Sequence, residues 1–269
     1  FPDRGHPEGF LRGGQGGEVH ADPLLWLDGL ELALDRLAKL ADLSQVDAVS
    51  VSGQQHGSVY LAAGYEAALA DGNRATSLSA KISPVLSRRS SPIWMDSSTA
   101  AECAEIAAAL GGDQAVCDLT GSVATMRFTG PQIRRFAKLD PAAWAKTRRV
   151  HLVSSFFASV LAGKDAAIDT GDGAGMNLMD IRKGDWAPAT LAATAPDLAT
   201  KLPPVRPGST VAGGISAYFV ARHGFSPKCQ VVIGTGDNPS SLVGMGASKP
   251  GKVVISLGTS DTLFAAIEG

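Results

Sequence analysis

The sequence predicts an α/β fold, because short apolar strands alternate with helical segments along the chain. Residues 231–233 form a β-branched run bounded by glycines, which is typical of a buried strand, and a helix start follows it. Residues 141–162 show the order helix, strand, helix. Open α/β sheets bind their ligands at the carboxyl ends of strands, so polar residues at those ends are the candidate site residues.

The composition is that of a chain with a sizeable core. The 269 residues are 45% hydrophobic and 19% charged, and this length allows one large domain or two ordinary ones. Basic and acidic residues number 24 and 26. This balance leaves no excess of positive charge to attract nucleic acid or an anionic membrane, so neither is an expected partner.

The cysteines and the apolar stretches predict the cellular compartment of the protein. Cys103, Cys117 and Cys229 are widely spaced and form no CxxC pair, so neither a disulfide framework nor a zinc site is indicated. The longest strongly apolar stretch, residues 152–162, is too short to span a bilayer and is expected to be a core helix. No signal peptide is visible, and a reducing cytoplasm is the expected location.

A loop, a helix and two strands are predicted first. Residues 1–22 are rich in Gly, Pro and charge, as expected of a loop at a sheet edge. Asp22 can cap a helix whose first position is Pro23, and leucines then recur at spacings of three and four. Residues 46–51 alternate as a strand, and strand character resumes at 58–61.

His56 lies on the tight, glycine-flanked turn between these two strands, directly after Gln55. A histidine in such a turn serves either as a structural hydrogen-bonding group or as a functional one. The residues alone leave both interpretations open.

The middle of the chain contributes two more polar candidates. Residues 62–91 are predicted to be a surface excursion, and residues 91–99 a short strand leading into a capped helix at about 100–110. Asp96 follows that strand and is either a capping carboxylate or a site residue. Arg127 lies between short helices expected near 114–119 and 131–138, and it is either a surface arginine or a site residue.

Asp237 occupies the most suggestive position. It follows the strand at 231–233, and Gly234 and Gly236 allow a ligand to approach the backbone. Asn238 is the predicted N-cap of the next helix, with Pro239 at its first position. The alternative is that Asp237 is only a turn or capping residue.

Two further segments complete the prediction. Residues 169–180 are read as a glycine-loosened strand ending in a turn at 182–186. After a linker at 244–250, residues 252–257 and 261–266 are predicted strands joined by the turn Gly258, Thr259 and Ser260. Such a turn offers backbone N–H groups and hydroxyls to an anion, and it suits phosphate.

Six motifs in order resemble the FGGY carbohydrate kinases and, within that family, the xylulokinases of the animal type. The motifs are SGQQHGSVYL at 52–61, PIWMDSSTAAEC at 92–103, TGSVATMRFTGPQI at 120–133, DGAGMNLMDIRKGDW at 172–186, GTGDNPSSLVGMG at 234–246 and ISLGTSDTLF at 255–264. The resemblance covers the chain from about residue 8 onward. It implies a ribonuclease-H-like, actin-like architecture with ATP and sugar between two α/β domains.

The resemblance also implies domain limits. Residues 1–247 correspond to the sugar-binding domain without its first strands, and residues 248–269 to the start of the ATP-binding domain. The chain begins at Phe1 rather than Met and stops after a predicted hairpin, so it looks like an internal fragment of a longer protein. The first phosphate motif and the adenine pocket of the family are not represented, so this fragment by itself need not be active.

Site roles follow from the matched positions. Asp237 matches the catalytic base, and a carboxylate suits phosphoryl transfer because it can accept the proton of the attacking hydroxyl. The positions that match the family's ketose-binding residues are His56, Arg127, Asp237 and Asn238. Gln55 and Asp96 lie in motifs that approach the same pocket, and Gly258, Thr259 and Ser260 match the turn that holds the ATP phosphates. No metal ligand is assigned.

The expected function of the full-length protein is phosphorylation of D-xylulose to D-xylulose 5-phosphate with magnesium-ATP. The expected partners are therefore the sugar and ATP. One alternative is a fragment or paralogue that binds sugar without turning it over. Another is a kinase of the same family that acts on ribulose, glycerol or another polyol.

Overall fold

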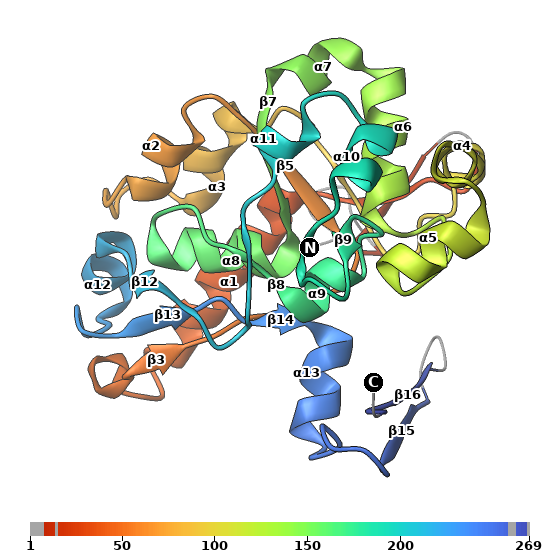
Figure 1. Cartoon of the computed structure of the whole chain (residues 1–269). Helices are drawn as coiled ribbons and strands as arrows, with labels where there is room; N and C mark the ends of the chain where they lie inside the picture. Colours follow the sequence, from red (N-terminus) through yellow and green to blue (C-terminus); the bar gives the residue numbers. More distant parts are fainter. Residues whose placement is uncertain (1–7, 14–15, 258–261, 268–269) are drawn as a thin grey trace.

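The computed structural model describes residues 8–13, 16–257 and 262–267 as a mixed α/β structure (Figure 1). The helices are α1 (Pro23–Leu37), α2 (Tyr65–Ala70), α3 (Leu78–Ile82), α4 (Ala100–Leu110), α5 (Asp113–Thr120), α6 (Thr129–Leu139), α7 (Pro141–Lys146), α8 (Val153–Ala162), α9 (Thr170–Ala174), α10 (Pro188–Thr194), α11 (Leu198–Lys201), α12 (Ala217–His223) and α13 (Asp237–Gly244). Within the described residues, the segments Leu43–Gln45 and Ser83–Val85 form 3-10 turns.

The strands are short. They are β1 (Leu11–Arg12), β2 (Val19–Ala21), β3 (Ala48–Val49), β4 (Ser52–Gly53), β5 (Ser58–Ala62), β6 (Ser91–Pro92), β7 (Thr147–Leu152), β8 (Ile168–Asp169), β9 (Met179–Asp180), β10 (Asp185–Trp186), β11 (Val205–Arg206), β12 (Val211–Gly214), β13 (Gln230–Val232), β14 (Thr235–Gly236), β15 (Val253–Ser256) and β16 (Thr262–Ala265). Among the described residues, parallel pairs join β13 to β3, β14 to β4 and β11 to β8.

Two consecutive parallel pairs lead to the site. Strand β13 lies beside β3, and the chain then continues through Gly234 into β14, which lies beside β4 with Thr235 opposite Ser52. Gly234 has φ +70°, and a Cβ there would lie 2.0 Å from the carbonyl oxygen of Val51. Only glycine fits this close approach of the two strands.

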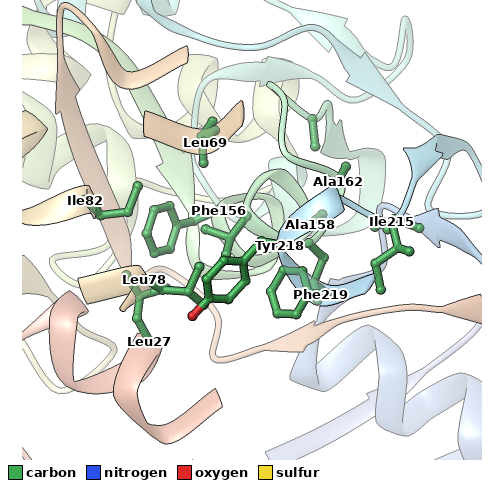
Figure 2. Packing of buried hydrophobic residues seen from close by; sticks show 14 of the residues in the cluster. Leu27, Leu69, Leu78, Ile82, Phe156, Ala158, Ala162, Ile215, Tyr218 and Phe219 are labelled. Atoms are coloured by element: carbon green, nitrogen blue, oxygen red, sulfur yellow. The ribbon is translucent and has the colours of Figure 1, made fainter. Parts of the chain in front are cut away.

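The main core packs around α8, which is buried over most of its length, as expected for the apolar stretch at 152–162. In Figure 2, Phe156 of α8 lies among side chains from α1, α2, α3 and α12, including Leu27, Leu69, Leu78 and Tyr218. Burial of large apolar side chains of this kind stabilises a fold by about 1.5–3 kcal/mol each. A second cluster forms between β5, β7, α6 and α7 around Tyr60, Phe136 and Trp144.

Several predicted elements are confirmed. Helix α1 starts at Pro23, and the Asp22 side chain accepts a hydrogen bond from the Leu24 N–H at 2.9 Å. The order helix, strand, helix over residues 141–162 is found as α7, β7 and α8. Strands β15 and β16 pair as an antiparallel hairpin, and α13 leads from the body of the structure toward it (Figure 1).

The predicted surface excursion at 62–91 is wrong. This segment contains α2 and α3, and its Leu69, Leu78 and Ile82 are buried in the main core. The apolar pairs Tyr65 with Leu69 and Leu78 with Ile82 are spaced by four residues, so each short helix presents one apolar edge to the core. The many small residues between them hid this pattern.

The predicted strand over 169–180 is wrong over most of its length, because only Asp169 in β8 and Met179–Asp180 in β9 are strand residues. Strand β8 ends at Asp169, and helix α9 follows at once. The Asp169 carboxylate caps α9 by accepting hydrogen bonds from the N–H groups of Gly171 at 2.9 Å and Asp172 at 3.2 Å. This side-chain cap stabilises a helical turn that two glycines would otherwise disfavour.

Along the described residues, no helix combines the length and the apolar character that a membrane crossing requires.

The glycine between β13 and β14 gives a first testable prediction. We expect Gly234→Ala to lower the free energy of unfolding by more than about 3 kcal/mol, since it adds a backbone clash to the cost of a positive φ. The control is Gly224→Ala, at φ +78° with no atom within 4 Å of its Cβ position, which should cost only about 1 kcal/mol. Urea unfolding measures both values, and equal costs would contradict the account.

Candidate functional site

The site lies where β4 and β14 end side by side. Asp237, the first residue of α13, is exposed, and its Oδ1 accepts a hydrogen bond from the backbone N–H of Gln55 at 2.9 Å. The Asn238 Nδ2 donates to the Gln55 Oε1 at 2.8 Å. The structure therefore brings the predicted residues Gln55, Asp237 and Asn238 together, with Gln55 joining the turn after β4 to the start of α13.

The predicted capping role of Asn238 is wrong. Helix α13 begins at Asp237 with Gly236 as its N-cap, and Asn238 lies inside the first turn. Because Gly236 is fixed by its pairing with Gly53, the helix starts as soon as β14 ends. The Asn238 amide is thereby available to bind Gln55 instead of capping the helix.

His56 adopts a left-handed backbone conformation, with φ 69°. Its ring stacks on Phe128 at a centroid distance of 4.6 Å and an angle of 25°. The His56 Nδ1 lies 3.1 Å from the carbonyl oxygen of Gly175. Since a carbonyl only accepts, Nδ1 carries the hydrogen, and in the neutral ring Nε2 is the acceptor.

The electrostatics of the site keep His56 neutral. Burial is the largest cause that lowers its pKa to about 4, and the positive charge of Arg127 lowers it further. The Gly175 carbonyl and the negative charge of Asp237 act in the opposite direction but do not outweigh burial. At neutral pH the ring is therefore a hydrogen-bond acceptor at Nε2, suited to a hydroxyl group.

Arg127 is exposed and lies at the edge of a cavity of about 450 Å³. The cavity is lined by Trp94, Met95, Asp96, Ser97, Thr125, Met126 and Arg127. Two residues after Arg127, the Thr129 Oγ1 donates to the His56 carbonyl oxygen at 3.2 Å, so this segment is fixed to the His56 turn. The segments that carry Arg127 and Asp96 thus line the same cavity.

Asp96 is only 1% exposed, and its carboxylate is engaged by donors of the protein itself. Its oxygens accept hydrogen bonds from the Val19 N–H at 2.9 Å, the Ser98 Oγ at 2.6 Å and the Gln132 Nε2 at 2.7 Å. Burial favours the neutral acid, but hydrogen bonds from His20, Ser98 and Val19 hold its pKa well below the usual range. Asp96 therefore organises the floor of the cavity, and its contact with a sugar stays a prediction.

Two buried aspartates behind the site were missed at the level of sequence. Asp169 caps α9, and it also accepts a hydrogen bond from the Thr235 hydroxyl two residues before Asp237. Asp172 is 2% exposed, and its Oδ2 accepts from the Ser154 Oγ at 2.5 Å. Asp169 is the last residue of β8 and Asp172 lies three residues later in α9, so placing the end of β8 at Asp169 would have identified both.

The proposed phosphate turn lies outside the described residues. Gly258, Thr259 and Ser260 therefore remain predicted phosphate contacts, although Ser256 and Thr262 on either side of the turn are paired in the hairpin. Within the described ranges, no group of three or more His, Cys, Asp and Glu residues is arranged to hold a metal ion.

A parallel strand end that carries an exposed carboxylate is a position typical of ligand sites in α/β enzymes. Residues 86–244 match the N-terminal domain of the FGGY family of carbohydrate kinases, and the chain belongs to that family.

Curated relatives of the chain include xylulose kinases. The chain is 47% identical to xylulose kinase 2 of Arabidopsis thaliana over 92% of its own length and 45% of that protein. It is also 47% identical to the xylulose kinase of Rattus norvegicus, over 97% of the chain and 50% of the relative. The chain thus spans about half the length of the curated relatives it matches.

Solved structures confirm the predicted actin-like fold. A xylulose kinase from Brucella ovis superposes with a TM-score of 0.78 at 27% identity, over 95% of this chain and 48% of that one. A ligand-bound xylulose kinase from Lactobacillus acidophilus gives a TM-score of 0.77 at 18% identity, over 94% and 47% of the two chains. The second likeness supports the fold alone.

Asp96 provides a second testable prediction. Asp96→Asn places an amide among donors, so it should cost about 3 kcal/mol of unfolding free energy at pH 7. Because the folded-state pKa of Asp96 is depressed below 3.8, its contribution is present above that pH and is lost as pH falls further. Urea unfolding at pH 7 and pH 3 should show the difference between the two proteins shrinking in acid.

The control for this substitution is Ser98→Ala, which removes one hydroxyl donor to Asp96 and should cost about 1 kcal/mol. A difference between the wild type and Asp96→Asn that stayed constant from pH 7 to pH 3 would contradict the ionised, hydrogen-bonded state of Asp96.

Proposed function

We propose that the chain is the sugar-binding part of a cytoplasmic, ATP-dependent kinase that converts D-xylulose to D-xylulose 5-phosphate. In this proposal residues 1–247 form the sugar-binding domain, and residues 248–269 begin the ATP-binding domain. The observation that carries it is the contact between the Asp237 carboxylate and the Gln55 N–H, which holds an exposed base at the end of β14 next to His56. The relatives named as xylulose kinases, at 45–47% identity, support the choice of sugar.

Each residue then has a chemical task. Asp237 accepts the proton of the attacking sugar hydroxyl, which is the main covalent task that phosphoryl transfer leaves to a side chain. The neutral His56 accepts a hydrogen bond from another hydroxyl at Nε2, and Arg127 donates to a sugar oxygen from the far side of the pocket. Asn238 and Gln55 keep Asp237 in place through their mutual hydrogen bond.

ATP and Mg²⁺ enter this proposal as a substrate and its counter-ion. ATP supplies the phosphoryl group, and the turn Gly258, Thr259 and Ser260 would contact its phosphates. Mg²⁺ is commonly held by phosphate oxygens with only one or two carboxylates. We therefore assign no metal-binding role to the described residues.

Fold alone does not select the sugar. A gluconate kinase from Lactobacillus acidophilus and a Plasmodium falciparum glycerol kinase have TM-scores of 0.78 and 0.73 at 18% and 14% identity. The alternatives of another polyol substrate, or of sugar binding without turnover, are therefore outcomes of the experiment. The decisive assay measures ADP formation by the complete gene product with D-xylulose, L-xylulose, D-ribulose and glycerol.

Asp237→Asn should lower kcat for D-xylulose by 10² to 10⁴, the usual contribution of a general base. Sugar affinity should change much less, because the amide oxygen can still accept from the Gln55 N–H. The matched control is Asp113→Asn, since Asp113 is also an exposed first residue of a helix, α5, but lies outside the site. Equal kcat values for Asp237→Asn and the control would reject Asp237 as the base.

His56→Asn should weaken D-xylulose binding at least tenfold and leave the fold intact. Asparagine tolerates the left-handed backbone at this position, but it removes the ring that stacks on Phe128 and its Nε2 acceptor. Isothermal titration with the sugar measures the change. Unchanged affinity would mean that His56 serves only the structure of the turn.

A further inference from the structure

Asp172 is a buried carboxyl group with few hydrogen-bond partners. It lies on α9, is 2% exposed, and accepts one hydrogen bond, from the Ser154 Oγ to Oδ2 at 2.5 Å. Its other oxygen, Oδ1, is buried and has no hydrogen-bond partner among the described residues. A buried ionised carboxylate in this situation would be costly.

The other two buried aspartates near the site, Asp169 and Asp96, each accept several hydrogen bonds from protein donors. Asp169 accepts from two backbone N–H groups and from the Thr235 hydroxyl. Asp96 accepts from Val19, Ser98 and Gln132. Several donors stabilise the charged form of a carboxyl group, whereas Asp172 has only one. Its surroundings therefore favour the neutral acid.

Among the residues that the structure describes, no cation lowers the pKa of Asp172. Asp169 at the end of β8 and Asp237 after β14 are the charged groups that act on it, and both are acidic. On β11, Arg206 is exposed and donates to the Val205 carbonyl oxygen at 2.8 Å. Asp180 on β9 pairs with Lys183 at 3.3 Å.

The remaining neighbours of Asp172 carry no charge. Helix α8 contributes Ser154 and contains no charged residue. His56, which contacts Gly175 just after α9, is neutral near pH 7. Burial first, and then the charges of Asp169 and Asp237, raise the pKa of Asp172 to about 7.

Asp172 lies directly against the residue that precedes Asp237. A Cβ added to Gly236 would lie 2.8 Å from the Asp172 Oδ1 and 2.6 Å from the Gln55 Cγ. Gln55 and Asp172 therefore both pack against the Cα of Gly236, and Asp172 lies next to the backbone from which Asp237 projects.

We propose that Asp172, in its neutral acid form, is a positioning residue that packs against Gly236, so that Asp237 projects from a strand end without a second negative charge buried behind it. This inference rests on the proposed kinase function. Two like charges close together raise the pKa of one of them, and here the buried partner, Asp172, is the one whose pKa is raised. A second negative charge would also repel the incoming phosphoryl group.

The first test measures the carboxyl group itself. In the complete gene product labelled with ¹³C at aspartate side-chain carboxyls, the resonance absent from Asp172→Asn should titrate with a midpoint above pH 5.5. Ser154→Ala should move that midpoint to higher pH, because the serine hydrogen bond lowers the pKa of Asp172. A midpoint below pH 5.5 in the wild type would overturn the inference, and this measurement does not require kinase activity.

The second test measures the reaction with D-xylulose. We expect kcat/KM for the wild type to fall at least fivefold from pH 6.5 to pH 8.5, and that of Asp172→Asn, which stays neutral, to change less than twofold. At pH 6.5 the kcat/KM values of the wild type and Asp172→Asn should agree within threefold. Parallel pH profiles would reject the positioning role, whereas absence of sugar-dependent activity in the wild type and all variants would reject the proposed function instead.

Discussion

The parallel pairing of β4 with β14 is the constraint on which the rest of the site depends. It places Gly53 and Gly236 side by side at the carboxyl ends of two strands that are far apart in sequence. A Cβ at Gly53 would lie 2.6 Å from the backbone nitrogen of Ser154, so the start of α8 packs closely against these strands. The turn with Gln55 and the helix with Asp237 then begin next to each other, within hydrogen-bond reach.

Helix α9 connects this strand end with the remainder of the site. The Gly175 carbonyl just after it accepts the hydrogen of the His56 Nδ1, and Asp172 lies against Gly236. Asp169 links the start of α9 to β14 through the Thr235 hydroxyl. The five-residue helix α9 thus contacts both the His56 turn and the strand end before Asp237. The hydrogen bond between Ser154 and Asp172 joins α9 in turn to α8.

Local chemistry was enough to predict part of this arrangement. Asp22 with Pro23 marks a helix start, and the glycines around Asp237 mark a strand end, because caps and turns depend on adjacent residues. Helix α9 was not predicted, since its glycines favour a loop and only the Asp169 cap and tertiary packing make it helical. Two other features could not be predicted from periodicity, because they depend on contacts between segments far apart in sequence. These are the hydrogen bonds of Val19 and Gln132 to Asp96, and the contacts of Gln55 that join the turn after β4 to α13.

The central claim is that these strand ends form a pocket that selects a ketopentose. Thermal unfolding of the chain in the presence of D-xylulose, D-ribulose, glycerol or buffer tests it most directly. A sugar at a hundred times its dissociation constant adds about 2.7 kcal/mol of stability. The account predicts stabilisation by D-xylulose above the other compounds, and a smaller effect in Asp237→Ala. A cooperative transition that no sugar shifts would contradict the assigned pocket.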